Sequence, residues 1–188
     1  NTTHLSQVTT LDALITNGLN DASISFNSLV SEKENLIAQI LYYARSDEQQ
    51  ARIDTVTGKF TATHQVQIDT VDTAIDLANH LNDSTISYDA LVIEKDSLIA
   101  IVDGTALLSE DEKATRRVSI TTKFNTTHLS QVTTLDTLIG NGLNDASISF
   151  SSLVSEKENL ISQVLYYARL DEQESRIDTV ISKFTATH

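Results

Sequence analysis

One stretch decides the fold: DEQQARIDTVTGKFTATHQVQIDTVDTAIDLAN, residues 47–79. Its large apolar residues recur every three or four positions, as they do on one face of an α-helix. They are Ile53, Val56, Phe60, Ile68, Val71 and Ile75, and His64 continues the series. No proline occurs in the chain, and no glycine signal in the stretch is strong enough to stop a helix. We therefore predict a single helix over residues 47–79, about 50 Å long at 1.5 Å per residue.

The same stretch crosses the boundary between two sequence repeats. Residues 1–64 return without a gap as residues 125–188, with ten differences, and residues 65–124 form a third, diverged copy. A Thr-His pair marks each repeat, at His4, His64, His128 and His188, and the middle interval is four positions longer than the other two. We therefore divide the chain into repeat 1 (1–64), repeat 2 (65–124) and repeat 3 (125–188), and we expect it to be a piece of a longer array.

The extra length of repeat 2 locates two turns. About two residues are added near 78–80, and about two more at 102–105. Two residues inserted into a packed helix would rotate everything beyond them by about 200°. Insertions are therefore expected in turns. Each repeat then has three helices, and the third continues into the first helix of the next repeat.

The first two helices have recognisable boundaries. The first ends at Asn17-Gly18, and at Asn141-Gly142 in repeat 3, where we expect glycine to adopt the left-handed conformation that closes a helix. The second spans about residues 27–43 and carries adjacent apolar pairs such as Leu29-Val30 and Leu36-Ile37. A buried face this wide suits a helical bundle better than a two-stranded seam.

The third helix begins at a capping box in two of the repeats. Ser46-Asp47-Glu48-Gln49 and Ser109-Glu110-Asp111-Glu112 each place a serine hydroxyl before the helix and a Glu or Gln three residues later. Repeat 3 has Leu170 at the serine position, so we expect Asp171 with Glu174 to substitute for the box.

Together these segments predict an all-α fold, an elongated tandem array of three short-helix bundle repeats with continuous connecting helices. The alternative places the same helices in a parallel trimeric coiled coil, interrupted by loops at residues 19–26 and near 44–47. The junctions at 53–68 and 117–132 are rich in β-branched residues, so local propensity also tolerates a strand there.

Phrases such as Ser175-Arg-Ile-Asp-Thr-Val180 and Ile68-Asp-Thr-Val-Asp-Thr-Ala-Ile75 belong to short capped helical segments rich in Asp, Thr, Ser and Ala. Across all three repeats this pattern resembles the coiled-coil repeats of bacteriophage fibre and whisker proteins, particularly those of marine phages. The resemblance implies a parallel trimer without catalytic residues, which acts as a passive fibre.

Charge and composition exclude several classes of function. The 26 acidic and 13 basic residues give a formal net charge of −13, which disfavours nucleic-acid binding. No apolar run of about 18 residues is present, so we expect no membrane insertion within this segment. The chain has no cysteine, and it has no glycine-rich phosphate loop, zinc-protease motif or nucleophile elbow. We therefore expect no enzyme activity and no cofactor.

The candidate site residues are the four repeated histidines, His4, His64, His128 and His188. They could bind a metal or an anion across three chains, or act as a pH switch. A metal needs converging ligands, and these histidines lie far apart in the sequence, one to a repeat. His64 lies four residues from both Phe60 and Ile68, so we favour a partly buried, hydrogen-bonded structural role and predict no metal site.

Two further motifs also favour structural interpretations. The pairs Asn20-Asp21, Asn82-Asp83 and Asn144-Asp145 lack the alternating ligands and closing glutamate of an EF-hand loop, so helix capping is their expected role. Tyr42-Tyr43 could be an exposed binding spot, because tyrosine suits interfaces. Repeat 2 has Asp103-Gly104 in that region, so we expect the tyrosine pair to pack over the turn.

The sequence therefore predicts a non-enzymatic structural protein that forms an extended fibre, a spacer or a surface or virion appendage, located outside the cell or on a virion. The expected partners are proteins, through self-association or neighbouring repeats, because one repeat cannot bury its apolar face alone. The alternative is a helical-bundle protein-binding module of a surface receptor or adhesin. None of the ten differences between repeats 1 and 3 creates an aromatic anchor, which favours the structural role.

Overall fold

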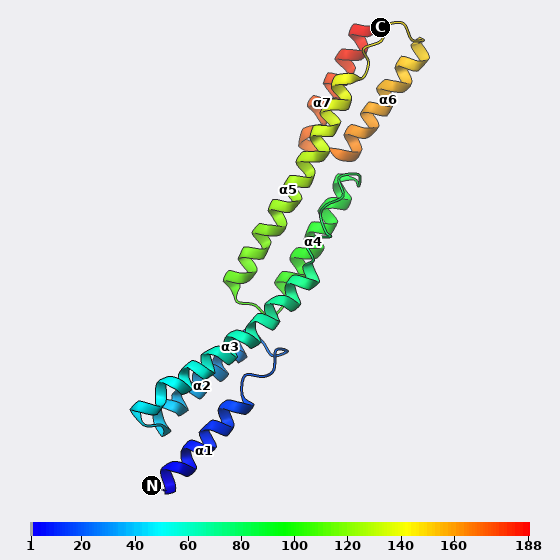
Figure 1. Ribbon diagram of the computed structural model, residues 1–188. Helices are drawn as coiled ribbons and strands as arrows, with labels where there is room; N and C mark the ends of the chain where they lie inside the picture. The colour runs from blue at the N-terminus through cyan, green and yellow to red at the C-terminus, as the bar shows by residue number, and fades with distance from the viewer. Residues whose placement is uncertain (1) are drawn as a thin grey trace. The chain divides into compact units, whose positions relative to one another are not determined.

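Helices account for every regular element in residues 2–188, the part of the chain that the computed structural model describes (Figure 1). They are α1 (Thr2–Asn17), α2 (Phe26–Tyr43), α3 (Ser46–Ile75), α4 (Tyr88–Gly104), α5 (Glu110–Asn141), α6 (Phe150–Tyr167) and α7 (Leu170–Thr187). The prediction of an all-α fold is confirmed.

The two long helices run without a break through the sequence junctions. α3 contains residues 53–68 and α5 contains residues 117–132, so the strand interpretation of these junctions is wrong. Tertiary burial outweighs the weak helix propensity of the β-branched residues, because side chains such as Val56 and Val71 lie in the core. α3 ends at Ile75, before the predicted residue 79, because Asp76 turns into the left-handed region at a φ of 32°.

The helices belong to two compact units. The first contains the chain up to Asp76 together with Ala100–Arg117, and the second contains Leu77–Ile99 together with Val118–His188. Repeat 2 therefore contributes segments to both units, whereas repeats 1 and 3 each lie within a single unit.

In the first unit, α1, α2 and the first half of α3 form an up-down-up bundle. Residues 44–45 form a short link that reverses the chain between α2 and α3. α1 and α3 run in the same direction. Asp12 of α1 pairs with Arg52 of α3, and the carbonyl of Ile15, later in α1, pairs with Lys59, later in α3.

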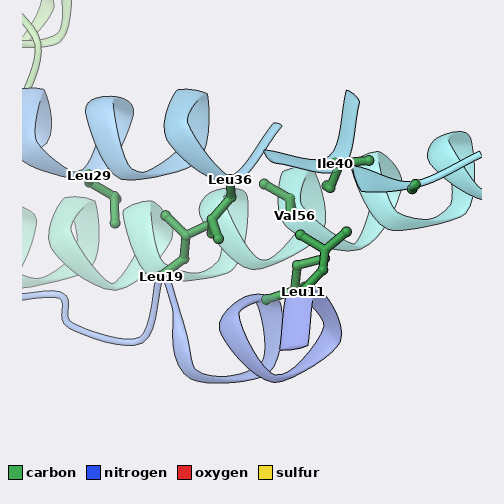
Figure 2. Packing of buried hydrophobic residues seen from close by; sticks show 8 residues of the cluster. Leu11, Leu19, Leu29, Leu36, Ile40 and Val56 are labelled. Carbon is green, nitrogen blue, oxygen red and sulfur yellow. The ribbon is translucent and has the colours of Figure 1, made fainter. Parts of the chain in front are cut away.

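Apolar residues from all three helices meet in the core of this bundle. Figure 2 shows the side chains of Leu11, Leu19, Leu29, Leu36, Ile40 and Val56 pointing toward one another, and Ile15 and Ala44 complete the cluster. Full burial of one leucine or isoleucine side chain contributes about 1.5–3 kcal/mol. The cluster is therefore the main source of stability in the bundle.

The second unit builds the same core from residues 124 positions further along. This cluster consists of Leu135, Ile139, Leu143, Leu153, Leu160, Val164, Ala168 and Val180. The second half of α5, α6 and α7 take the places of α1, α2 and α3. Val164 stands where repeat 1 has Ile40, and the other seven residue types are unchanged.

The turn after the first helix differs from the prediction. Among the described residues no glycine has a positive φ; Leu19, Leu81 and Leu143 occupy the left-handed region instead, at 57°, 56° and 58°. Gly18 is needed for space, because a Cβ there would lie 2.9 Å from the Leu36 side chain and 3.0 Å from the Leu14 carbonyl. The prediction of a left-handed glycine was therefore wrong.

The caps of the third helices agree with the prediction in one repeat and depart from it in two. The Ser109 hydroxyl accepts from the backbone N–H of Glu112, whose carboxylate accepts from the Ser109 N–H, so this capping box is confirmed. In repeat 1 the cap is Arg45, whose N–H donates to Glu48, and in repeat 3 it is Arg169 with Glu172. The boxes proposed on Ser46 and on Asp171 with Glu174 were wrong, because the cap lies one residue earlier than expected in repeat 1 and two residues earlier in repeat 3.

One of the two predicted insertion sites lies in a turn. Residues 78–80 fall between α3 and α4, as predicted. Residues 102–104 form the end of α4, and the turn follows at 105–109. The second turn therefore lies a few residues later than predicted, and the extra length is absorbed between α4 and α5.

Candidate functional site

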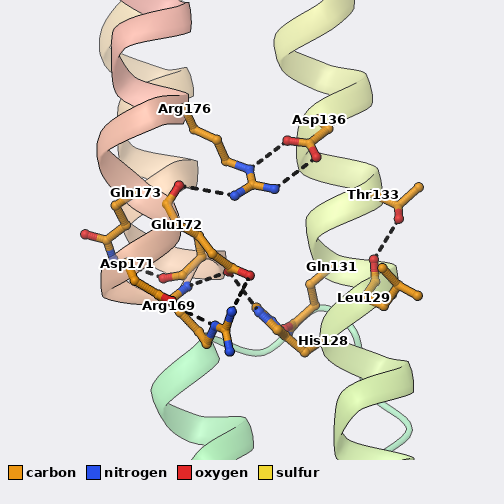
Figure 3. A network of polar contacts seen from close by, with 11 residues as sticks. His128, Leu129, Gln131, Thr133, Asp136, Arg169, Asp171, Glu172, Gln173 and Arg176 are labelled. Atoms are coloured by element: carbon orange, nitrogen blue, oxygen red, sulfur yellow. Dashed lines mark hydrogen bonds and ion pairs between the residues drawn. The ribbon is translucent and has the colours of Figure 1, made fainter.

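Polar contacts join the first and third helices of each repeat at matching positions. In repeat 3, Arg176 of α7 donates from Nε and Nη2 to the two carboxylate oxygens of Asp136 on α5, at 2.7 and 3.0 Å (Figure 3). This hydrogen bonding to Asp136 raises the pKa of Arg176. A two-point contact fixes both the spacing and the orientation of the helices. The same fork joins Arg52 to Asp12 and Arg116 to Asp72.

A lysine of the third helix closes the end of the first helix. Lys59 Nζ donates to the backbone oxygens of Ile15 and Thr16, at 2.9 and 2.5 Å. Lys183 does the same for Ile139, at 2.8 Å, and for the next carbonyl. The last carbonyls of a helix have no partner within the helix and carry partial negative charge, so a cation there is stabilising.

The loop after the first helix is held from both sides at its left-handed leucine. The Thr63 hydroxyl donates to the Leu19 carbonyl, and the Leu19 N–H donates to Glu32 Oε1 at 2.9 Å. Equivalent contacts hold Leu81, through Thr127 and Glu94, and Leu143, through Thr187 and Glu156. Sequence reasoning missed this role of the glutamates, although the sequence repeats each of them as part of a Glu-Lys pair, at 32–33, 94–95 and 156–157.

His128 occupies the centre of a network that we call the junction network. Its Nε2 lies 3.0 Å from Glu172 Oε2, and its Nδ1 lies 3.3 Å from Gln131 Oε1 (Figure 3). The Gln131 amide nitrogen donates to the Ile86 carbonyl at 2.8 Å, which fixes the orientation of the amide. Both imidazole nitrogens therefore face acceptors, and the arrangement is satisfied when both carry a proton.

His64 forms the same network one repeat earlier. Its Nε2 lies 2.7 Å from Glu112 Oε1 and its Nδ1 lies 3.0 Å from Gln67 Oε1. Gln67, which is fully buried, donates to the Ile24 carbonyl at 2.7 Å. Each junction network therefore ties the loop of one repeat to the helices of the next.

The aromatic residue that follows the adjacent loop covers each of these histidines. The ring of Phe26 lies 4.7 Å from that of His64, and the ring of Tyr88 lies 4.7 Å from that of His128. Ring contact and hydrogen bonds together restrict each imidazole to one orientation. The partly buried, hydrogen-bonded placement expected for His64 agrees with this geometry.

The histidines nearest the two ends each have half of this environment. His4 Nε2 lies 3.2 Å from Glu48, as at the other junctions. The ring of His188 lies 4.7 Å from that of Phe150, which corresponds to Phe26. A fifth histidine, His80, was not singled out from the sequence; its Nδ1 lies 2.8 Å from Glu94, the glutamate that holds the neighbouring loop.

The glutamates of the network are stabilised in their charged form. Burial raises the pKa of Glu172, but hydrogen bonds from the Arg169 backbone and from His128 outweigh it and leave the pKa lowered. Burial likewise raises the pKa of Glu112, and hydrogen bonds from Ser109 and His64 outweigh it. These carboxylates therefore act as fixed anionic acceptors at neutral pH.

The histidines do not meet in the described part of the chain. No group of three His, Asp or Glu side chains that could hold a metal ion occurs within residues 2–188. Each of His4, His64 and His128 instead has a single carboxylate neighbour. No helix in these residues is long and apolar enough to cross a membrane.

The Asn-Asp pairs shape the loops. Asn20 donates to the backbone oxygens of Thr16 and Asn17, so it caps the end of α1. Asp21 accepts from the backbone and the hydroxyl of Ser23, which lowers the pKa of Asp21 and closes a tight turn. The expected capping role is thus confirmed for Asn20, whereas Asp21 stabilises the turn itself.

The tyrosine pair does not pack over the turn as a unit. Tyr42 is 81% exposed and Tyr43 is 39% exposed, so the packing prediction was wrong for Tyr42. Tyr43 lines a shallow groove between α1 and α2, together with Gln7 and Leu14. In repeat 3 the equivalent Tyr167 donates its hydroxyl hydrogen to the Thr85 carbonyl, at 3.3 Å.

Comparisons with known proteins give no relative from which a role could be inferred. No protein-family model, no characterised sequence and no solved structure matches the chain. A role for the chain is therefore inferred from the repeated contacts described above.

Proposed function

We propose that the chain is a segment of a non-enzymatic structural protein in which successive helical repeats act as a spacer, as in a fibre or a surface or virion appendage. The supporting observation is the recurrence of one junction network, at His64 and again at His128, with the same residue types and nearly the same distances. Its polar groups are used to connect helices and loops of successive repeats. An extracellular or virion location belongs to the same proposal and is supported by the resemblance to phage fibre repeats.

The contacts within a repeat define its length along the helix axis. His4 lies beside Glu48 of α3. The next equivalent histidine, His64, lies on the same helix as Glu48 and follows it by sixteen residues. Sixteen residues rise by about 24 Å. Repeat 3 has the same interval, from Glu172 beside His128 to His188. Because the other helices of a repeat fold back on this one, a whole repeat advances the chain by only about 24 Å.

A duplicated chain tests the spacer function by its length. Residues 1–124 are joined to the N-terminus of the 188-residue chain, so that Phe124 is followed by Asn1; the natural sequence has the same Phe-Asn step at 124–125. The 124 added residues contain two repeats, so we expect the maximum dimension to grow by about 48 Å and the radius of gyration by about 14 Å. Small-angle X-ray scattering measures both quantities, with the 188-residue chain as the control.

A compact chain gives a different result. Compact proteins of 188 and 312 residues have radii of gyration of about 16 and 20 Å. An increase of only about 4 Å on duplication would therefore contradict the spacer proposal. Light scattering on the same samples gives the mass, and a mass of three chains at all concentrations would favour the parallel trimer instead.

A further inference from the structure

The turn after the second helix of a repeat differs in length between the two junctions inside the chain. Residues 105–109 separate α4 from α5, whereas Ala168 and Arg169 alone separate α6 from α7. At the first junction the longer turn reaches the start of α2, where the Phe26 N–H donates to the Ala106 carbonyl at 2.8 Å. The N–H groups in the first turn of a helix have no partner within the helix, so this carbonyl satisfies one of them.

The second junction has no equivalent of this contact. Tyr88 corresponds to Phe26, and within residues 2–188 the Tyr88 N–H has no carbonyl partner. A pocket of about 500 Å³ lies there instead, between residues 87–89 at the start of α4 and residues 165–173 around the shorter turn. We call it the Tyr88 pocket. It lies within the second unit, and the repeats on both sides of this junction are present in the chain.

Large apolar side chains line this pocket and remain exposed. Leu165, Tyr166 and Leu170 are 56%, 47% and 84% exposed. Leu170 stands where repeat 1 has Ser46 and repeat 2 has Glu110, so the aliphatic side chain at this position is specific to repeat 3. Exposed apolar side chains that gather around a concavity are typical of an interaction site. An aliphatic group of a partner would remove them from water.

The pocket also carries an unpaired charge. Asp89 lines it and is exposed, and its carboxylate has no hydrogen bond or ion pair within residues 2–188. Repeats 1 and 3 have the uncharged residues Asn27 and Ser151 at this position. A carboxylate here favours a cationic group of the partner, and the net charge of −13 disfavours an acidic partner.

We infer that the Tyr88 pocket binds a short basic and aliphatic peptide segment of a partner protein, in the place that residues 105–107 occupy at the first junction. The peptide supplies a backbone carbonyl to the Tyr88 N–H, as Ala106 does to Phe26. Its aliphatic side chain packs on the exposed leucines, and its basic side chain pairs with Asp89. In such complexes main-chain hydrogen bonds give affinity and side-chain contacts give specificity. The inference goes beyond the spacer function, which needs no such pocket.

A peptide titration tests the binding. The probe is acetyl-Lys-Thr-Ala-Leu-Leu-amide, in which a lysine precedes the sequence of residues 105–108. Added to the 188-residue chain, it should shift the nitrogen-15 NMR signal of the Tyr88 amide until the site is saturated, with a dissociation constant on the order of 1 mM. The Phe26 amide already has its carbonyl and should not shift, so it is the internal control. No saturable shift at Tyr88 up to about 10 mM peptide would overturn the inference.

Single substitutions test the side-chain contacts. Leu170→Ser, which matches Ser46 of repeat 1, should weaken binding by about fivefold. The matched control Leu129→Ser changes a leucine that is 65% exposed in the same unit but outside the pocket, and it should leave the affinity unchanged. Asp89→Asn should weaken binding of the lysine peptide by about two- to fivefold. It should not affect acetyl-Ala-Thr-Ala-Leu-Leu-amide. An unchanged affinity in Leu170→Ser would overturn the inference.

An exchange of turns should fill the pocket from within the chain. The variant carries residues 103–108, Asp-Gly-Thr-Ala-Leu-Leu, in place of residues 165–168, Leu-Tyr-Tyr-Ala. Its Tyr88 amide hydrogen should exchange with solvent more slowly than in the parent chain, and the peptide should no longer bind. Continued binding to this variant, with the helical circular dichroism of the parent, would overturn the inference.

Light scattering without peptide tests the other occupant, a second copy of the chain. We expect no difference between the parent and Leu170→Ser in how the mass depends on concentration. A mass that rises with concentration in the parent and stays constant in Leu170→Ser would show that a second copy fills the pocket, and would overturn the assignment to a partner peptide.

Discussion

Replacing Gln131 by alanine tests whether the junction network stabilises the fold. The change removes the donor to the Ile86 carbonyl and the acceptor for His128 Nδ1, in a side chain that is only 2% exposed. Loss of a buried hydrogen bond with an unsatisfied partner costs about 1–3 kcal/mol, and the lost methylene adds about 0.8 kcal/mol. Regained side-chain freedom and the helix propensity of alanine offset about 1–2 kcal/mol. We expect a net loss of about 1–2 kcal/mol.

Gln7→Ala is the matched control, because Gln7 is the same residue type in the same local sequence but is exposed. We expect its unfolding free energy to change by less than about 0.5 kcal/mol. Urea unfolding followed by circular dichroism, at micromolar protein so that the chains stay separate, gives both values. In a chain of this size a loss of about 1–2 kcal/mol corresponds to a fall in Tm of about 2–8 °C. Equal small effects for both variants would refute the idea that the junction network contributes to stability.

Two further predictions concern two glycines and one carboxylate of the junction network. Gly58→Ala should raise the free energy of unfolding by about 0.5–1 kcal/mol, because Gly58 lies inside a helix and nothing lies within 4 Å of the added Cβ. Gly18→Ala should lower it by about 1–3 kcal/mol, because the added Cβ overpacks against its neighbours. Thermal unfolding of the two variants checks that the two effects have opposite signs. Glu172→Gln should lower the free energy of unfolding by about 1–2 kcal/mol at pH 7, because it removes an anionic acceptor. The pKa of Glu172 in the folded protein is lowered from 4.5, so the difference between variant and parent should disappear as the pH falls below 4.5. Urea titrations at several pH values measure this difference, and Glu174→Gln, on an exposed side chain, should show no such pH dependence.

The positions of the helices could be predicted because their signals are local. The apolar spacing of residues 47–79 indicated a helix that α3 largely confirms, and the second helix, predicted at 27–43, is found at Phe26–Tyr43. The Ser109 capping box also depends only on residues three apart in sequence. Such patterns can be recognised from residues that lie close together in the sequence.

The contacts of the site could not be predicted, because most of them join residues more than forty positions apart. Glu32 was visible only as part of a repeated Glu-Lys pair, and its bond to the Leu19 backbone depends on how α2 packs beside α1. The left-handed conformation of Leu19 has the same origin: Gly18 is required by the nearby Leu36 side chain, so the turn falls one residue later. For the histidines, the interval was visible in the sequence, but the partners on either side were not.

The insertions in repeat 2 show which part of a repeat determines its length. The histidine and its glutamate are separated by 44 residues in repeats 1 and 3, and by 48 at the middle position. The arginine–aspartate forks change in the same way, from 40 residues to 44. Both loops therefore absorb extra residues while the contacts persist.

The interval from the glutamate of one network to the next histidine is sixteen residues in every repeat, at 48–64, 112–128 and 172–188. Because this interval lies along a helix, one added residue would turn the histidine by about 100° away from its partners. Spacing along the proposed array is thus set by the helix interval, and the loops can vary without changing it.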